Sequence, residues 1–383
     1  MGIQNLLPSL SKISKNCSLH DFAGKKVAID GFVWLHRAAI SCAQELAYNP
    51  ETESILFSLN RRMAQFQSTG AIPVVVFDGQ YLPSKSLTNE KRHSQREANL
   101  LKAEQLMSSG DSKEAYQYYI QAIDIQPSTV YTWIKSLQQS NIEYYVAPYE
   151  ADAQLAYFAR TGYVSAVLTE DSDLIAYQCP LTLFKLNDNM EVISISFSDV
   201  LSYLDLTIFQ FLAVCALSGC DYIEHIKGIG FQKALKIVKN SLQTPSSVIS
   251  TIRIENKLYV PENYELQLER AIITFLHAPV YDIISNKLMF LEPFLSSDYI
   301  VPDYLGNDIG PDLLDGIIKG KLNPRTLQPY EAPQSTGKMS PYFSSFRPPK
   351  PSSSPYFQKY DSKKPLQKIS SKISSYMQLL YVN

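Results

Sequence analysis

Four short apolar runs in the first half of the chain have the length and composition of buried β-strands. Between and around these runs, apolar residues recur with helical spacing over about 33–48, 54–68, 84–108, 112–124 and 127–140. The apolar runs themselves cover residues 26–30, 72–78, 142–147 and 165–169. Short strands that alternate with helices predict an α/β domain, with a mainly parallel central sheet flanked by helices.

The end of the chain has a different composition. Residues 331–383 hold 12 Ser and 7 Pro, and their 8 Lys and Arg against 2 acidic residues give a net charge of +6. The preceding 330 residues carry 27 basic and 35 acidic side chains, a net of −8. We therefore expect a folded core over 1–300, an extension over 301–330 that packs on it, and a disordered Ser/Pro/Lys-rich tail over 331–383.

Two other classes of protein are disfavoured by the sequence. The longest apolar runs, such as 71–77 and 211–217, are far shorter than the ~20 residues of a membrane span, so no membrane association is expected. The five cysteines form no CxxC pair and the five histidines have no ligand spacing. A disulfide framework or a Cys/His zinc site is therefore not expected.

Acidic residues gather where the predicted strands end. Asp30 and Asp78 each close an apolar run and precede a glycine, and another acidic pair follows the run at 165–169. Any one of these carboxylates has an alternative interpretation, because a strand-end Asp often caps the following helix. The carboxyl ends of parallel strands meet at one edge of a sheet, so several acids there predict a shared site. The candidates are Asp30, Asp78, Glu150, Asp152, Asp171, Asp173 and Asp221.

Such a cluster needs a cation. Oxygen ligands without His or Cys favour Mg²⁺ or Mn²⁺. Glu150 and Asp152 do not face each other in a regular helix, because positions i and i+2 point apart. Pro148 indicates that a helix begins here, where acidic side chains are favoured and can spread toward two neighbouring metals.

A glycine turn and a lysine-bearing helix follow at 228–239. Gly228 and Gly230 let backbone N–H groups approach a phosphate at the start of the helix. Lys233 and Lys236 recur at a spacing that follows a nucleic-acid backbone, in a pattern like a helix-hairpin-helix. The alternative is an ordinary helix with solvated lysines.

The predicted helix from residue 84 carries a second basic set. Lys85 and Arg92 are seven residues apart and therefore lie on one face, from which both reach a phosphate opposite the metals. The alternative is a solvated helix face, since acidic residues are interspersed along the same segment.

Five segments together resemble the flap endonuclease superfamily of 5′-nucleases, and within it the exonuclease 1 branch. They are MGIQNLL at the start, VFDGQYLPSK (76–85), APYEADAQLAY (147–157), LTEDSDLIAY (168–177) and LSGCDYIEHIKGIG (217–230). The resemblance covers about 1–300, in the order of the family's motifs. It implies a PIN-like nuclease core built from an N-terminal region (about 1–100) and an internal region (about 138–225), with a helical arch (about 84–140) and a helix-two-turn-helix (about 217–240).

The resemblance also implies an activity. It is a Mg²⁺-dependent 5′→3′ double-strand-specific DNA exonuclease with 5′-flap endonuclease activity, acting in DNA repair such as mismatch repair, end resection or recombination. Two Mg²⁺ ions, for which Mn²⁺ can substitute, are implied. One set of ligands is Asp30, Asp78, Glu150 and Asp152, and the other is Asp171, Asp173 and Asp221. A K⁺ ion is implied at the helix-two-turn-helix.

Further residues match family positions that handle DNA. Lys85 and Arg92 match the basic pair that polarises the scissile phosphate. Predicted DNA contacts are Gly2, Phe32, His36, Arg96, Gly228, Gly230, Lys233 and Lys236. Phe32 stands where the family usually has Tyr, a change that keeps an aromatic ring for stacking.

Alternatives to this reading stay open. One is a dedicated flap endonuclease, and the other is a non-catalytic scaffold that binds DNA ends. In the tail, residues 336–343 resemble a sliding-clamp-binding box, and Ser-Pro-Tyr-Phe at 340–343 and 354–357 faintly resembles mismatch-repair partner motifs. An ordinary Ser/Pro tail explains both equally well. A nuclear monomer is expected.

Overall fold

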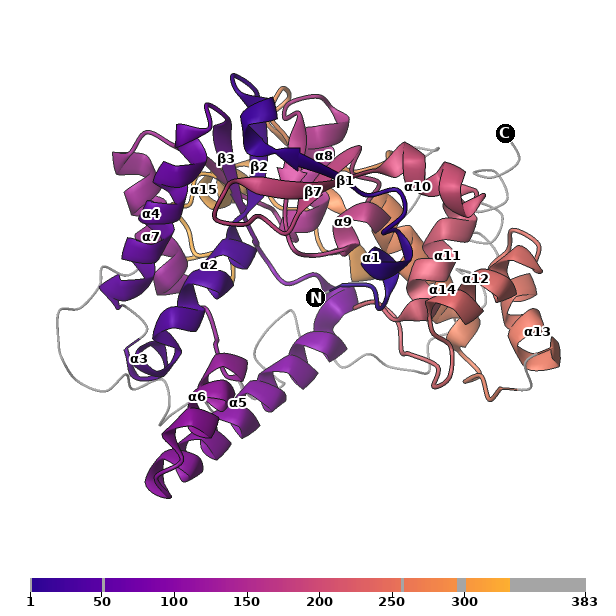
Figure 1. Cartoon of the computed structure of the whole chain (residues 1–383). Coiled ribbons are helices and arrows are strands. Elements are labelled where there is room, and N and C mark those ends of the chain that lie inside the picture. The colour runs from indigo at the N-terminus through magenta and orange to yellow at the C-terminus, as the bar shows by residue number, and fades with distance from the viewer. Residues whose placement is uncertain (1, 50–51, 256–257, 295–300, 331–383) are drawn as a thin grey trace. The chain divides into compact units, whose positions relative to one another are not determined.

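A seven-stranded sheet runs through the described part of the chain, in the strand order β1-β7-β6-β5-β2-β3-β4 (Figure 1). The structure is a computed structural model that describes residues 2–49, 52–255, 258–294 and 301–330. Strands β6 to β4 pair in parallel, whereas β7 and β1 are antiparallel to their neighbours. The predicted α/β class with a mainly parallel sheet is confirmed. The strands are β1 (Lys15–Ser18), β2 (Lys26–Asp30), β3 (Ile72–Phe77), β4 (Glu143–Val146), β5 (Ala166–Leu168), β6 (Leu181–Phe184) and β7 (Glu191–Ser196).

The central strands are buried along nearly their whole length. In β2 every residue after Lys26 is buried, and in β3 every residue after Ile72. Helices cover both faces of such strands, which is why they read as continuous apolar runs in the sequence. The edge strand β1 has no fully buried residue, and β7 has only two buried positions among its six. The sequence pattern therefore did not predict these two antiparallel strands.

Helices flank the sheet on two sides. In Figure 1, α2 (Gly31–Ala39), α4 (Glu53–Ser68) and α7 (Pro127–Gln139) lie on one side and α8 (Ala151–Arg160) on the other. Trp133 of α7 is fully buried and meets the Phe77 ring edge-on, with ring centroids 5.2 Å apart. Helix α7, which lies within the range 84–140 expected for the arch, thus packs on the core. Only α5 (Ser86–Ser108) and α6 (Ser112–Gln121) project from it as a packed pair.

The remaining helices follow mostly after the sheet. Helix α11 is buried at nearly every position and packs against α12 and α14, so it anchors this second helical region. The elements are α1 (Leu6–Ser9), α3 (Ala43–Tyr48), α9 (Asp173–Ala176), α10 (Phe197–Leu204), α11 (Ile208–Ser218), α12 (Phe231–Lys239), α13 (Pro245–Glu255), α14 (Tyr264–His277), α15 (Pro311–Ile318), a hairpin of β8 (Pro279–Asp282) and β9 (Lys287–Phe290), and 3-10 turns η1 (Leu19–Phe22), η2 (Ile40–Cys42), η3 (Pro83–Lys85) and η4 (Asp303–Leu305).

The extension over 301–330 contacts the core through β4 and α7. The hydroxyl of Tyr144 in β4 donates to the carbonyl of Lys319 at 2.9 Å. Tyr330 stacks on Tyr131 of α7, with ring centroids 4.4 Å apart and planes 9° from parallel. These contacts fix the segment that follows α15 on the edge of the sheet at β4.

The strand register brings the acidic ends of the strands together. Asp30 pairs with Val76, two residues before Asp78, and Ile29 pairs with Leu168, so Thr169 stands level with Asp30. The carboxyl ends of β2, β3 and β5 therefore meet at one edge, as the sequence predicted.

Two further sequence expectations concern membranes and the tail. Among the described residues, no single helix is long and apolar enough to cross a bilayer, although the sharply bent pair α10 and α11 together has the length and composition for it. The predicted disordered tail, 331–383, and its partner motifs lie outside the described residues.

Candidate active site

Asp30 combines a structural role with membership of the acid cluster. Its Oδ1 accepts a hydrogen bond from the N–H of Val33 at 3.1 Å and so caps α2, and its Oδ2 accepts one from the Thr169 hydroxyl at 2.9 Å. The carboxyl is buried, and burial together with the charge of Asp78 raises its pKa to about 7. The prediction that Asp30 caps a helix is therefore correct, and the capping carboxylate also lies close to that of Asp78.

Helix α8 carries two of the predicted acids in its first turn. It begins where Pro148 indicated, with Glu150 as the N-cap residue and Asp152 in the first turn. The N–H of Ala151 donates to Asp78 Oδ1 at 2.8 Å, which ties the end of β3 to the start of α8. Burial, and after it the charges of Asp171 and Asp30, raise the pKa of Asp152 well above its ordinary value.

Asp171 lies in the turn between β5 and α9, and Asp173 is the first residue of α9. The N–H of Asp173 donates to Asp171 Oδ1 at 3.0 Å. Asp173 is almost fully buried, with 2% of its surface exposed, and its Oδ1 has no hydrogen-bond partner. Burial and the charges of Asp171 and Asp221 raise its pKa well above the ordinary value. A buried carboxylate oxygen without a hydrogen-bond donor destabilises the folded protein unless a cation binds it.

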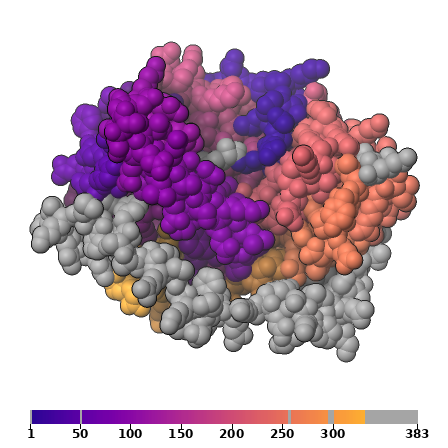
Figure 2. All heavy atoms as spheres, turned by 90° about the horizontal axis from the view of Figure 1, so that it is seen from below, coloured from indigo at the N-terminus to yellow at the C-terminus, as the bar shows by residue number. Residues whose placement is uncertain are grey.

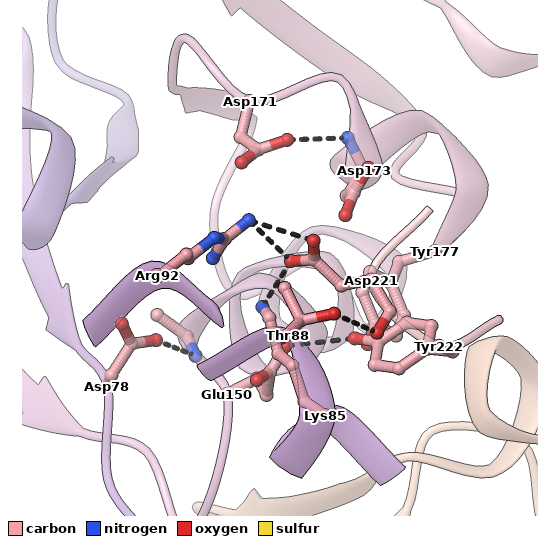
Figure 3. A network of polar contacts seen from close by, with 11 residues as sticks. Asp78, Lys85, Thr88, Arg92, Glu150, Asp171, Asp173, Tyr177, Asp221 and Tyr222 are labelled. Carbon is pink, nitrogen blue, oxygen red and sulfur yellow. Dashed lines mark hydrogen bonds and ion pairs between the residues drawn. The ribbon is translucent and has the colours of Figure 1, made fainter. Parts of the chain in front are cut away.

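Two cations from the start of α5 face the cluster (Figure 3). Lys85 Nζ lies 2.9 Å from Glu150 Oε2 and 3.0 Å from Asp221 Oδ2. Arg92 Nη2 donates to both carboxylate oxygens of Asp221, at 2.8 and 2.9 Å. Burial by itself would lower the pKa of Lys85, but the charges of Glu150 and Asp221 outweigh it and hold the pKa well above its ordinary value. Lys85 and Arg92 are therefore charged and bound to carboxylates in this structure.

A pair of buried tyrosines supports Glu150 from behind. The hydroxyl of Tyr222 donates to Glu150 Oε2 at 2.9 Å and lies 2.5 Å from the hydroxyl of Tyr177. Both rings pack edge-on against Phe275. No role was predicted for these tyrosines from the sequence, although they follow the acids in LTEDSDLIAY and SGCDY. The sequence feature that could have indicated their role is a tyrosine close to each of these two acidic motifs.

The residues fit a pair of hard divalent cations by chemistry. All seven are carboxylates, and the orphaned oxygen of Asp173 and the raised pKa values of Asp152 and Asp173 show negative charge that the described residues do not compensate. No three His, Cys, Asp or Glu side chains of the described residues are already close enough to ligate one ion. Two of the seven carboxylates, Glu150 and Asp221, are instead held in ion pairs by Lys85 and Arg92.

The N-terminus and α2 place the other predicted contacts around the cluster. A Cβ on Gly2 would stand 2.3 Å from Asp171 Oδ1, so only glycine fits against that carboxylate. Phe32 and His36 are half-buried on α2. Burial and the neighbouring Arg96 lower the pKa of His36 to about 4, which leaves it neutral at pH 7. Arg96 itself is paired with Asp124 at 2.6 Å.

The glycine turn and its lysines stand apart from the carboxylates, at the start of α12. Gly228 has a positive φ of 91°, whereas Gly230 is the N-cap of α12 with an ordinary extended backbone. A Cβ at either position would meet no atom within 4 Å, so the surface over the turn is open. Lys236 is exposed and Lys233 half-buried on the same helix. Figure 2 shows the surface hollowed between the purple atoms of the α5–α6 region and the coral atoms of the helical region that follows the sheet.

Comparison with known proteins places the chain in a family. Residues 1–99 match the XPG N-terminal domain, and residues 141–221 match the XPG I-region. The DNA damage-inducible protein DIN7 of Saccharomyces cerevisiae is 34% identical over 297 residues, which cover 76% of this chain and 69% of that protein. The chain belongs to the exonuclease 1 family of 5′-nucleases.

Other members of the exonuclease 1 family are longer. The exonuclease 1 of Arabidopsis thaliana is 35% identical over 345 residues, which cover 89% of this chain and 47% of that protein. The chain thus spans about half the length of that relative. Among solved structures, the catalytic core of Rad2 in complex with a DNA substrate matches with a TM-score of 0.55 and 16% identity, covering 72% of this chain and 86% of the Rad2 chain. This likeness confirms the predicted fold, an α/β core of the 5′-nuclease type.

The tyrosine that supports Glu150 gives a first prediction. Tyr222→Phe removes the hydrogen bond to Glu150 Oε2 and leaves the ring packing intact. We expect the Mg²⁺ concentration that half-saturates cleavage to rise about tenfold, because loss of a group that orients a ligand weakens metal affinity. Tyr157→Phe is the matched control, since its hydroxyl donates to Asp282, outside the cluster.

A second measurement distinguishes a loss of Glu150 positioning from a general loss of protein stability. The rise in melting temperature on adding Mg²⁺, measured without DNA, is expected to shrink in Tyr222→Phe and to stay unchanged in Tyr157→Phe. Equal Mg²⁺ titrations of wild type and Tyr222→Phe would show that the hydroxyl does not orient Glu150.

Proposed function

We propose that this chain is a Mg²⁺-dependent 5′→3′ double-strand-specific DNA exonuclease that also cleaves 5′ flaps. The observation that carries the proposal is the buried acid cluster with the orphaned oxygen of Asp173, faced by Lys85 and Arg92 at the carboxyl edge of the sheet. Membership of the exonuclease 1 family supports the substrate and the polarity. A scaffold that only binds DNA ends has no use for a buried cluster of uncompensated charge.

The proposed ligands of the two metals are the two sets predicted from the sequence. Asp30, Asp78, Glu150 and Asp152 would hold one ion, and Asp171, Asp173 and Asp221 the other. When bound, two Mg²⁺ ions stabilise the charge on the attacking and leaving oxygens of a phosphodiester displacement. The products of this hydrolysis are a 5′-phosphate and a 3′-hydroxyl.

Lys85 and Arg92 are proposed to exchange carboxylates for phosphate when DNA binds. Lys85 and Arg92 both contact Asp221 in this structure. A phosphate that displaced the Asp221 carboxylate would therefore lie within reach of both cations. Arg92 uses only Nη2 for both contacts with Asp221, and a guanidinium has further N–H donors that suit phosphate oxygens. Fixed donors aimed at the phosphate favour the charge that develops during cleavage.

Duplex binding is proposed at the glycine turn and α12. The open surface over Gly228 and Gly230 and the adjacent Lys233 and Lys236 suit a phosphate backbone and a K⁺ ion. Gly2, Phe32, His36 and Arg96 are proposed contacts nearer the cut. Nuclear localisation, a monomeric state and tail partners such as a sliding clamp or mismatch-repair proteins stay predictions.

One lysine of α12 gives a prediction on binding. Lys236→Ala is expected to weaken binding of a duplex and to make the dependence of log affinity on log salt shallower by about one unit, because one phosphate contact is lost. Fluorescence anisotropy over a series of salt concentrations measures this slope. Lys25→Ala is the control, since Lys25 is exposed at the opposite, amino end of β2. Identical slopes for the two variants would remove α12 from the interface.

A substrate panel tests the proposed function. A 5′-recessed duplex, a nicked duplex and a 5′ flap are incubated with the full chain, with and without Mg²⁺. We expect the recessed and nicked duplexes to be shortened and the flap to be cut, in Mg²⁺ only. Cutting of the flap alone would indicate a dedicated flap endonuclease. Binding of all three without turnover would indicate a scaffold and overturn the proposal.

A further inference from the structure

Tyr81 is an exposed aromatic residue at the rim of the acid cluster. Its side chain is 56% exposed, and it follows Asp78 by three residues. The segment between them is pinned, because the N–H of Gly79 donates to the carbonyl of Tyr149 at 2.6 Å and that of Gln80 to Pro148 at 3.1 Å. A Cβ on Gly79 would stand 1.9 Å from a backbone carbonyl, so this close approach needs glycine. Tyr81 is therefore held beside the segment that leads into Glu150.

Arg325 of the extension lies over the Tyr81 ring. Its guanidinium carbon is 4.7 Å from the ring centroid. Arg325 stands at the tip of a closed turn, in which the N–H of Asn323 donates to the carbonyl of Gln328 at 2.8 Å and Leu322 pairs with Pro329. The N–H of Arg325 donates to the Asn323 side chain at 2.9 Å. Both the backbone and the guanidinium of Arg325 are thus held in place.

Arg325 differs from the other cations of the site in what it binds. Lys85 and Arg92 are each paired with carboxylates of the cluster, and Arg96 with Asp124. In the part of the chain that the structure describes, no carboxylate lies within 4.0 Å of the Arg325 guanidinium. Through its contact with the Tyr81 ring, the guanidinium is held beside the segment that follows Asp78.

We propose that Arg325, positioned by Tyr81, binds a backbone phosphate of the DNA strand at the Asp78 end of the site. The proposal rests on the proposed function, since it concerns the same nucleic acid. Asp78 lies at one end of the network in Figure 3, and Asp173 and Tyr177 lie at the other. A cation at the Asp78 end would therefore contact a phosphate that flanks the one facing Lys85 and Arg92.

The chemistry favours phosphate as the ligand. A guanidinium is charged at every physiological pH and offers five N–H donors in a planar fork that matches phosphate oxygens. An exposed guanidinium stacked on a tyrosine keeps its edge donors free for such a ligand. A phosphate backbone that approaches a cluster of carboxylates also needs cations on more than one side to offset repulsion.

Arg325→Ala and Tyr81→Ala in the full chain test the contact. We expect Arg325→Ala to raise both the dissociation constant for a 5′-recessed duplex and the KM for its digestion about five- to tenfold, with kcat within about twofold of wild type. The salt dependence of binding should become shallower by about one unit. Tyr81→Ala should give part of this loss, and Tyr81→Phe should keep wild-type binding because the ring remains.

A matched control comes from the opposite end of the sheet. Lys25 lies over the Phe22 ring at 5.9 Å, a similar cation–aromatic contact away from the acids, and Lys25→Ala should bind and cleave like wild type. If Arg325→Ala matches Lys25→Ala in affinity and salt slope while wild type digests DNA, the inference is wrong and the proposed function stands. If wild type binds but never cleaves, the proposed function fails, and the binding data still decide the role of Arg325.

Discussion

Asp173→Asn is expected to abolish cleavage of duplex DNA and to make the metal-free protein more stable. The two effects have one cause. Asp173 is buried with an orphaned oxygen, and burial and the charges of Asp171 and Asp221 raise its pKa, so its charged form opposes folding. Because the folded pKa is raised, this carboxyl costs stability as the pH rises through its titration, and a neutral amide removes that cost.

Cleavage should fall by about 10³-fold or more, because a charge-neutral amide is a poor substitute for a carboxylate ligand of a hard cation. The rate is measured on a 5′-recessed duplex in Mg²⁺, and stability by thermal unfolding in a chelator and again in Mg²⁺. Wild type should gain more stability from Mg²⁺ than the variant, while both bind duplex DNA similarly. Asp199→Asn is the control, since this carboxylate pairs with Lys15 on the surface. A normal rate for Asp173→Asn would show that the metal assignment is wrong.

Lys85→Ala should lower the rate of cleavage by about 10²- to 10³-fold, the usual cost of losing a donor aimed at developing charge. It should also destabilise the metal-free protein by about 3 kcal/mol, because the half-buried Glu150 would lose its cation partner and Asp221 would keep only Arg92. Single-turnover digestion and thermal unfolding measure the two effects.

Magnesium separates the two roles of Lys85. Divalent cations should restore most of the lost stability, since they neutralise the same carboxylates, but they should not restore the rate. Lys91→Ala is the matched control, because Lys91 is an exposed lysine on α5, the helix that Lys85 precedes. An unimpaired rate for Lys85→Ala at saturating Mg²⁺ would confine this lysine to a structural role.

The parallel centre of the sheet could be predicted because a strand that is buried on both faces is a continuous apolar run within one segment of the sequence. Strands β2 and β3 are continuous apolar runs that end in Asp30 and before Asp78, and parallel pairing puts those ends together. The antiparallel pairs of β7 with β6 and β1 left no such signal, because they are partly exposed and depend on partners distant in sequence. The range of the arch that the family resemblance implied includes α7, whereas its buried face and the Trp133–Phe77 contact show that it covers the sheet.

The residues of the site could be predicted from the sequence, but the side chains that each of them contacts could not. Lys85 was expected to face a phosphate, yet without a polyanion the nearest opposite charges are Glu150 and Asp221, and it pairs with both. Tyr222 stands next to Asp221 in the sequence, but its hydroxyl reaches Glu150, 72 residues earlier. Such contacts arise from chain folding and have no local pattern.

The polarity of digestion tests the central claim most directly. A duplex with one recessed 5′ end carries a label on that 5′ end in one sample and on the 3′ end of the same strand in another, and each is digested with and without Mg²⁺. We expect the 5′ label to be released first, as short products with a 5′-phosphate, while the 3′-labelled strand shortens gradually, in Mg²⁺ only. Release of the 3′ label first, or equal digestion in a chelator, would contradict the claim.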